Sequence, residues 1–187
     1  GAFLPSSLMG AGEVQLKMQN LVDDSDYEDP ATAITGGLII GALDTAVKQG
    51  KALYVGISSY SNAYTEEAVN VCKENRFAPL AIHQPNYSML NRWIENGLMD
   101  TCSEHGLGMI AFCPLFQGLL TNKYLKGIPD GSRATISNSP LRKSEVNEQN
   151  IKVIQELNEH AKQRGQTLAQ MALSWVLREN RITSALI

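Results

Sequence analysis

The sequence predicts an α/β fold in which parallel strands alternate with helices. From residue 38 onwards, four short apolar runs are separated by polar loops and by stretches whose apolar residues recur at helical spacing. This alternation is typical of parallel strands joined by helical crossovers. The 187 residues are 43% apolar and 19% charged, ordinary values for one domain with a sizeable core. The pattern allows either an open doubly wound sheet or a (β/α)8 barrel.

The first expected helix spans 38–50 and closes with Gly50, a residue type that often follows the last helical turn. A strand is expected over 52–57, where the chain is apolar and rich in residues that favour strands. The loop 58–61 is rich in serine, and its hydroxyls can cap a helix over about 63–74.

A second strand is expected over 80–82, followed by a helix over about 93–105. A third strand, 109–112, must end before Pro114, because proline has no N–H group to donate to a sheet. The remaining expected elements are helices over about 145–164 and 167–179 and a strand over 182–187.

Residues 1–37 differ in character from the rest and are predicted to be unrelated to the domain over 38–187, or disordered. Five acidic residues lie between Asp23 and Asp29 and are followed by Pro30. Such a stretch predicts a solvated loop or a disordered linker.

Charge and composition narrow the function classes. A net charge of −3 gives no electrostatic reason to expect a nucleic acid or an anionic membrane surface. No run approaches the roughly 18 apolar residues that span a bilayer. The three cysteines are widely spaced, which predicts reduced thiols and a cytoplasmic setting, and the three histidines show no ligand spacing that would indicate a metal site.

Ligand sites in parallel α/β folds lie at the carboxyl ends of the strands. One aromatic ring and several polar side chains stand there, which suggests a planar, hydrogen-bonding ligand. These residues are Ser58, Ser59, His83, Gln84, Phe112 and Cys113. Neither GxGxxG nor GxxxxGK[ST] occurs, which argues against a Rossmann fingerprint or a P-loop.

The loop that continues to Arg133 is long for a compact domain. It retains aromatic and aliphatic residues, so we expect it to fold over other parts of the chain. They are Phe116, Leu119, Leu120, Tyr124 and Leu125.

Four motifs then occur in order: GKALYVGISSYS, HQPNYSMLNRWIENGL, AFCPLFQGLLTNKYLKGIPDGSRA and LAQMALSWVLRENRITSALI. Together they resemble the second half of an aldo-keto reductase, closest to bacterial glyceraldehyde-phosphate and methylglyoxal reductases and to the potassium-channel β subunit. The resemblance covers 41–187 and implies part of a (β/α)8 barrel, with the four strands as strands five to eight. It also implies NADPH-dependent reduction of small aldehydes and ketones.

Carried over by position, Ser58 and Gln84 resemble the pair that hydrogen-bonds the nicotinamide carboxamide. Ser59 stands where relatives have asparagine or arginine, and it is a shorter donor. Phe112 matches the aromatic residue that stacks on the nicotinamide.

The segment after Phe112 resembles the family's phosphate-binding stretch. Cys113 replaces a serine that is common in relatives and is a weaker donor. Lys123 and Arg133 match basic residues that reach the cofactor phosphates. The residues that match backbone around the pyrophosphate are Pro114, Leu115 and Gln117.

Each of these residues also has a simpler interpretation. Ser58 alone is more often a helix cap, Gln84 could merely end a strand, and Phe112 alone is typical of a core. Lys123 and Arg133 could be exposed loop charges. Cys113 is expected to be an inert thiol, because no histidine is placed to activate it.

The family's catalytic tyrosine, lysine, aspartate and histidine have no counterpart in this chain, so no catalytic residue is predicted. The family spaces aspartate and tyrosine as Asp-x-x-x-x-Tyr, but Val22 stands five residues before Tyr27. We therefore expect this truncated half-barrel to be inactive, or to be a non-catalytic cofactor-binding or regulatory fragment. Its two sheet edges would be covered by residues 1–37 or by a second copy in a homo-oligomer, or the product would be unstable.

Overall fold

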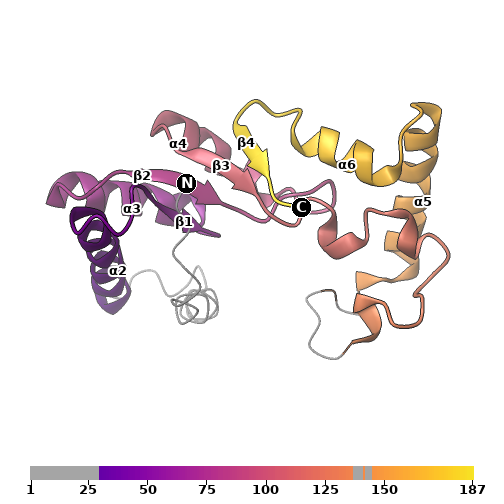
Figure 1. Cartoon of the computed structure of the whole chain (residues 1–187), viewed down its shortest axis with the longest axis horizontal. Helices are drawn as coiled ribbons and strands as arrows, with labels where there is room; N and C mark the ends of the chain where they lie inside the picture. The colour runs from indigo at the N-terminus through magenta and orange to yellow at the C-terminus, as the bar shows by residue number, and fades with distance from the viewer. Residues whose placement is uncertain (1–29, 137–140, 142–144) are drawn as a thin grey trace. The chain divides into compact units, whose positions relative to one another are not determined.

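The computed structural model describes residues 30–136, 141 and 145–187 (Figure 1). The chain divides into two compact units, called unit 1 and unit 2 below. In the described part of the chain, unit 1 comprises 30–84 and 94–108, and unit 2 comprises 85–93, 109–136, 141 and 145–187. The acidic run at 23–29 and Tyr27 lie outside the described residues.

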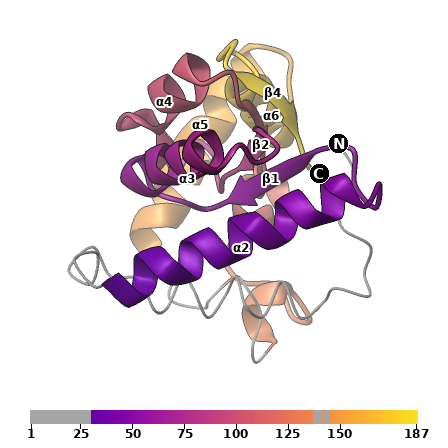
Figure 2. The same ribbon diagram turned by 90° about the vertical axis from the view of Figure 1, so that its left-hand side faces the viewer.

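Unit 1 contains a parallel crossover of the expected kind. Strand β1 pairs in parallel with β2, and helix α3 joins them along the chain. Helix α2 contacts both β1 and α3, and Figure 2 shows it as a long helix beside β1. The bounds are α2 Pro30–Lys48, β1 Val55–Ser58, α3 Asn62–Asn75, β2 Leu80–Gln84, the 3₁₀ turn η2 Trp93–Glu95 and α4 Leu98–Glu104.

The two strands of unit 1 approach each other closely at Gly56. A Cβ atom at this position would lie 2.5 Å from the main-chain oxygen of Ile82, a separation that real side chains do not tolerate. A register shift follows Val55 at the same place. A glycine in a strand interior is typical of such close backbone approaches.

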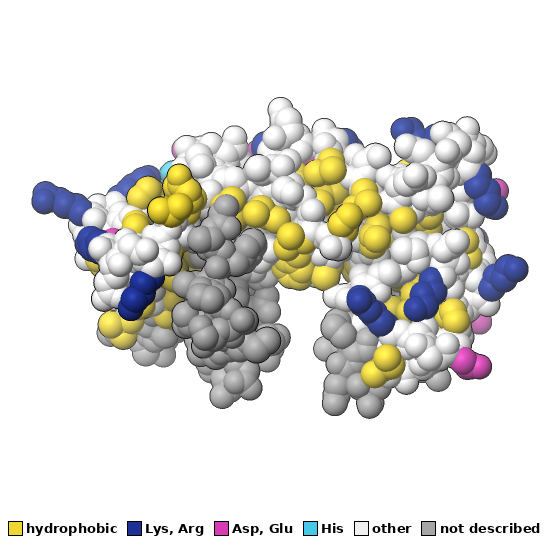
Figure 3. Space-filling model, in the orientation of Figure 1, with side chains coloured by type: hydrophobic (Ala, Val, Ile, Leu, Met, Phe, Trp, Pro, Cys, Tyr) yellow, Lys and Arg dark blue, Asp and Glu magenta, His cyan; other side chains and the backbone are white. Residues whose placement is uncertain are grey.

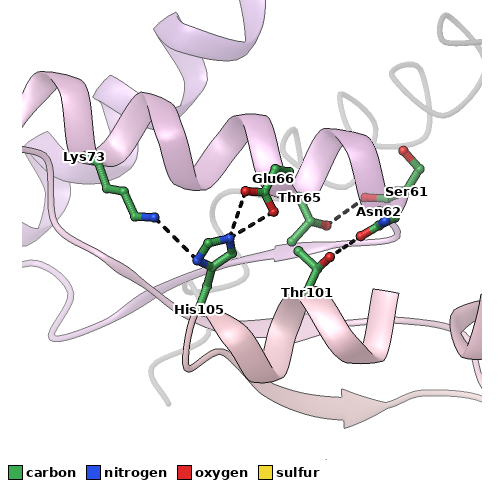
Figure 4. A network of polar contacts seen from close by, with 7 residues as sticks. All are labelled: Ser61, Asn62, Thr65, Glu66, Lys73, Thr101 and His105. Atoms are coloured by element: carbon green, nitrogen blue, oxygen red, sulfur yellow. Dashed lines mark hydrogen bonds and ion pairs between the residues drawn. The ribbon is translucent and has the colours of Figure 1, made fainter. Parts of the chain in front are cut away.

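Helices α3 and α4 of unit 1 are joined by polar side chains (Figure 4). The Nε2 atom of His105 lies 2.9 and 3.0 Å from the two carboxylate oxygens of Glu66, and its Nδ1 atom lies 3.4 Å from Lys73 Nζ. Thr101 donates to the side chain of Asn62. The two helices are in contact, and these polar side chains link them.

Unit 2 contains a second parallel pair, β3 with β4, in which Met109 lies opposite Ile182. Helices α5 and α6 follow β3 and precede β4 along the chain, and they pack against each other. The bounds are β3 Gly108–Ala111, η3 Phe116–Gly118, η4 Asn122–Tyr124, η5 Arg133–Thr135, α5 Glu148–Gln163, α6 Leu168–Val176 and β4 Ile182–Ala185.

The long loop after β3 packs into a hydrophobic core that it shares with α5 and α6, as expected from its apolar residues. Leu119 and Leu120 are fully buried, and Tyr124 is 1% exposed. They share a cluster with Ile154 of α5 and Ala172 of α6. Burying apolar surface in this way stabilises a loop that has no long helix or strand of its own.

Several expected elements differ from the structure in their bounds, three of them for a visible reason. Helix α2 begins at Pro30 and not at residue 38, because proline is compatible with the first helical turn, where no N–H donor is needed. Strand β1 begins at Val55, and Leu53 and Tyr54 before it are 77% and 59% exposed. The helix expected over 93–105 is interrupted at Gly97, whose φ of 98° does not continue a helix.

None of the helices among the described residues is long and apolar enough to cross a membrane.

Candidate functional site

The predicted residues of unit 1 lie at the ends of β1 and β2. Ser58 ends β1, and its hydroxyl donates to the main-chain oxygen of Gln84 over 2.7 Å. The Ser59 amide donates to the same oxygen over 3.2 Å, with φ at 60°. Because the Ser58 hydroxyl has only one proton, any further partner of its oxygen must be a donor.

Ser58 is not the cap of the following helix. Ser61 has that role, since its side chain accepts from the Tyr64 amide and begins α3. The side-chain amide of Gln84 is half-buried and has no hydrogen-bond partner among the described residues. An amide carries both donors and an acceptor, which suits a ligand carboxamide.

His83, which the sequence groups with the strand-end residues, lies in the core of unit 1. It is 0% exposed, and its Nε2 atom lies 3.2 Å from the main-chain oxygen of Tyr60. Burial lowers the pKa of His83 from 6.5 to about 4, so the imidazole is neutral at neutral pH. With Nε2 as the donor, His83 anchors the loop that carries Ser59.

The predicted residues of unit 2 begin with Phe112, directly after β3. Its amide donates to the oxygen of Pro85 over 2.9 Å, and its oxygen accepts from the Tyr87 amide over 3.2 Å. Both the amide and the carbonyl group of Phe112 therefore have hydrogen-bond partners within the protein. The side chain is only half-buried, so Phe112 is not a residue of the closed core.

Three predicted residues of unit 2 form one hydrogen-bonded cluster. The Gln117 side chain donates to the Cys113 sulfur over 2.9 Å. Arg133 Nη1 donates to Gln117 Oε1 over 3.1 Å. Burial raises the pKa of the Cys113 thiol, and the Arg133 charge opposes that rise only in part, so the protonated thiol is the form expected at neutral pH.

The backbone between these residues is unusual. Cys113, Phe116 and Gln117 have φ values of 56°, 46° and 56°, a region of backbone conformation that residues other than glycine adopt at some cost in energy. Local turns use the amides of Phe116 and Gly118. The amides of Leu115 and Gln117 have no acceptor within the described part of the chain. Pro114 is buried and has no amide proton.

The two predicted cations of the loop are exposed. Lys123 Nζ lies 6.0 Å from the ring centroid of Tyr124, and Arg133 reaches Gln117 as described. Neither forms an ion pair with another described residue. Figure 3 shows lysine and arginine side chains projecting from unit 2, on the right of the view. No group of three potential metal ligands occurs among the described residues.

The model of the Aldo/keto reductase family matches residues 22–187. The chain belongs to the aldo/keto reductase family. Members of this family are oxidoreductases that use a nicotinamide cofactor on small carbonyl compounds. The resemblance seen in the sequence is thereby confirmed, and the family match begins at residue 22, before residue 41 where the resemblance starts.

Among individual proteins, the chain is 52% identical over 150 residues to an L-glyceraldehyde 3-phosphate reductase of Escherichia coli K12. It is 30% identical over 154 residues to a putative voltage-gated potassium channel subunit beta of Schizosaccharomyces pombe. These matches cover 78% and 80% of the chain but only 43% and 44% of the relatives, so the chain spans less than half of their length.

A solved structure of a glycerol dehydrogenase from Gluconobacter oxydans is similar to this fold, with a TM-score of 0.60 and 24% identity. The match covers 76% of this chain and 42% of that protein. The similarity confirms the α/β fold as part of a (β/α)8 barrel.

Proposed function

We propose that this chain carries the NADPH-contacting residues of a reductase of small aldehydes and ketones. When bound, NADPH supplies the hydride for the reaction. The observation that carries the proposal is the cluster of Cys113, Gln117 and Arg133, which joins the turn after β3 to the far end of the long loop.

The cofactor phosphates would bind along this loop of unit 2. Arg133 and Lys123 are exposed cations without ion-pair partners among the described residues, and charge-assisted contacts to phosphate are strong. The amides of Leu115 and Gln117 would donate to pyrophosphate oxygens, and Pro114 would hold the turn between them. Cys113 would keep the Gln117 side chain in place, leaving its main chain free to donate.

The nicotinamide would be held by neutral contacts. Phe112 would stack on the ring, because an aromatic plane fixes a ring without competing for its hydrogen bonds. The Ser58 hydroxyl would accept a hydrogen bond from the carboxamide, since its own proton is donated to the main-chain oxygen of Gln84. The Gln84 side chain would complete the pair. We assign the cofactor as NADPH because two cations suit its extra phosphate, and parallel titrations with NADPH and NADH test this preference.

We further propose that the chain alone does not turn over substrate, since no residue matches the family's proton-donating tyrosine and its lysine. A chimaera tests the reductase function: residues 38–187 are joined to the first half of the Escherichia coli reductase, which is 52% identical over the matched part. We expect NADPH oxidation with methylglyoxal as substrate, and Phe112→Ala should raise the dissociation constant for NADPH. A folded chimaera without this activity would contradict the proposal.

A non-catalytic binding or regulatory module is the second candidate. It is favoured by the missing tyrosine and lysine and by the relative that is named a putative potassium channel subunit beta. The two candidates differ in the chimaera, where only a reductase segment restores turnover. Binding of NADPH without turnover in every chimaera would support the second candidate.

Two properties accompany the proposal. A cytoplasmic setting is supported by three free cysteines, two of them buried.

Association into a homo-oligomer is supported in unit 1 by the exposed Leu53 and Tyr54 before β1. Analytical ultracentrifugation of the wild type and of a Leu53→Lys, Tyr54→Lys double variant tests it. A wild-type monomer would contradict it.

A further inference from the structure

A stack of aromatic and cationic side chains surrounds Trp175, on α6 of unit 2. The Arg178 guanidinium carbon lies 3.6 Å from the Trp175 ring centroid, and that of Arg92 lies 5.3 Å from it. The Tyr87 ring also contacts Trp175, with 5.3 Å between centroids and 35° between planes. Cations over an indole face are attracted by its negative quadrupole, so the stack has a preferred geometry.

Arg178 fixes Tyr87 by hydrogen bonding as well. Its Nη1 atom donates to the Tyr87 hydroxyl over 3.3 Å and to the main-chain oxygen of Trp175 over 2.7 Å. Tyr87 is 0% exposed, so its hydroxyl needs a partner inside the protein. Arg178 itself is exposed and reaches inward from the end of α6.

Tyr87 in turn holds the backbone of Phe112. The Tyr87 amide donates to the Phe112 oxygen over 3.2 Å, and the Phe112 amide donates to Pro85 over 2.9 Å. Asn86, which lies between Pro85 and Tyr87, is also held, since the Trp93 indole donates to its main-chain oxygen over 2.8 Å. The direction of the Phe112 side chain therefore depends on the position of residues 85–87.

We propose that Arg178, acting with Trp175, is a positioning residue that sets the Phe112 ring through Tyr87. The inference rests on the proposed function, in which Phe112 stacks on the nicotinamide. Arg178 would touch neither cofactor nor substrate. Without Arg178 the Phe112 ring would shift, and a stacking ring that shifts by about one ångström loses much of its contact. The effect of Arg178 would therefore be confined to the nicotinamide, which Phe112 contacts.

Two ligands separate this role from a general structural one. NADPH carries the nicotinamide, and 2′-phospho-ADP-ribose is the same molecule without it. Dissociation constants for both are measured by fluorescence titration and by competition on the 187-residue chain. The variants are Arg178→Ala, Arg178→Lys and Tyr87→Phe, with Arg181→Gln as the matched control. Arg181 lies three residues along the same segment and pairs with Glu179 instead of Tyr87.

Arg178→Ala should weaken NADPH about tenfold and leave 2′-phospho-ADP-ribose within about twofold, given the size of a charged hydrogen bond. Tyr87→Phe removes only the hydroxyl and should weaken NADPH about threefold, with the core still filled. Arg178→Lys should fall between the wild type and Arg178→Ala, since lysine keeps the charge but not the planar fork. Arg181→Gln should change neither constant.

Equal weakening of both ligands, or no change in Tyr87→Phe and Arg178→Ala, would overturn the inference while leaving the proposed function intact. A wild-type chain that binds the two ligands equally would show that Phe112 does not stack on the nicotinamide. That result would overturn the proposed role of Phe112 and the inference together. Tyr87→Phe keeps the test decisive if Arg178→Ala does not fold.

Discussion

After β1 the chain needs only residues 59–61 before α3 begins, whereas after β3 it takes residues 112–147 before α5. The short loop is held by polar groups, with His83 beneath it and Ser61 capping the helix. The long loop is held by a hydrophobic core that it shares with α5 and α6. The polar contacts of His83 make the short loop sensitive to pH. Apolar burial holds the long loop without using the amides of Leu115 and Gln117, which stay available for a ligand.

The largest expected effect concerns the core under the long loop. Leu120→Ala should lower the free energy of unfolding by about 3 kcal/mol, because Leu120 is fully buried and its truncation leaves a cavity. Urea unfolding followed by circular dichroism measures the change. Leu177→Ala is the control, since this residue of the same unit is 50% exposed and should change stability by less than about 0.5 kcal/mol. Equal losses would show that burial in this hydrophobic core does not hold the loop.

A second effect of similar size concerns the short loop. Burial lowers the pKa of His83 to about 4, below its unfolded value of 6.5, so the unfolded chain binds the proton more tightly. The stability from neutral His83 is complete above pH 6.5 and is lost as the pH falls towards 4. The loss should be on the order of 3 kcal/mol.

The measurement is urea unfolding of the wild type and of His83→Gln between pH 7 and 4. Glutamine keeps a donor for the Tyr60 oxygen but does not titrate in this range. The difference between the two proteins should narrow as the pH falls. Parallel curves would mean that His83 does not link the short loop to pH.

A smaller effect is expected for the charge of the long loop. Arg133→Ala should weaken NADPH binding about tenfold, and salt should affect the variant less than the wild type. Lys126→Ala provides the control, because Lys126 is an exposed cation of the same loop that is not among the predicted contacts. If the two substitutions weaken binding equally, the phosphates respond to general charge and not to Arg133 itself.

The smallest effect concerns the helix cap after β1. Ser61→Ala should lower the free energy of unfolding by about 1 kcal/mol, because the Tyr64 amide loses its acceptor. Ser103→Ala, at an exposed position within α4, should change it by less than about 0.5 kcal/mol. Equal effects from the two substitutions would contradict the role of Ser61 as the cap.

Sequence patterns predict the helices and strands here better than the geometry of the loops. The serine-rich loop correctly predicts a capped helix, although Ser61 and not Ser58 is the cap. Apolar periodicity cannot register Gly97, whose positive φ divides one expected helix into a 3₁₀ turn and α4. A proline near an acidic run resembles a helix breaker, yet Pro30 lies in the first turn of α2, where its missing N–H costs nothing.

For the candidate site residues too, sequence patterns predict less than the folded loops determine. Arg133 and Gln117 are far apart in sequence, and only the resemblance to the family groups them; the hydrogen bond between them depends on the folding of the long loop. His83 illustrates the converse, because its place after an apolar run gives no sign that it points into the core. The contacts of Arg178 with Tyr87 join residues 91 positions apart, and no sequence pattern indicates them.

The most direct test of the proposed function is a titration of the 187-residue chain with NADPH, followed by the fluorescence of the nicotinamide, with methylglyoxal then added. We expect saturable binding that weakens in Phe112→Ala and in Arg133→Ala, and no oxidation of NADPH. A folded chain that does not bind NADPH, or binding that is unchanged in both variants, would contradict the assignment of these residues to the cofactor.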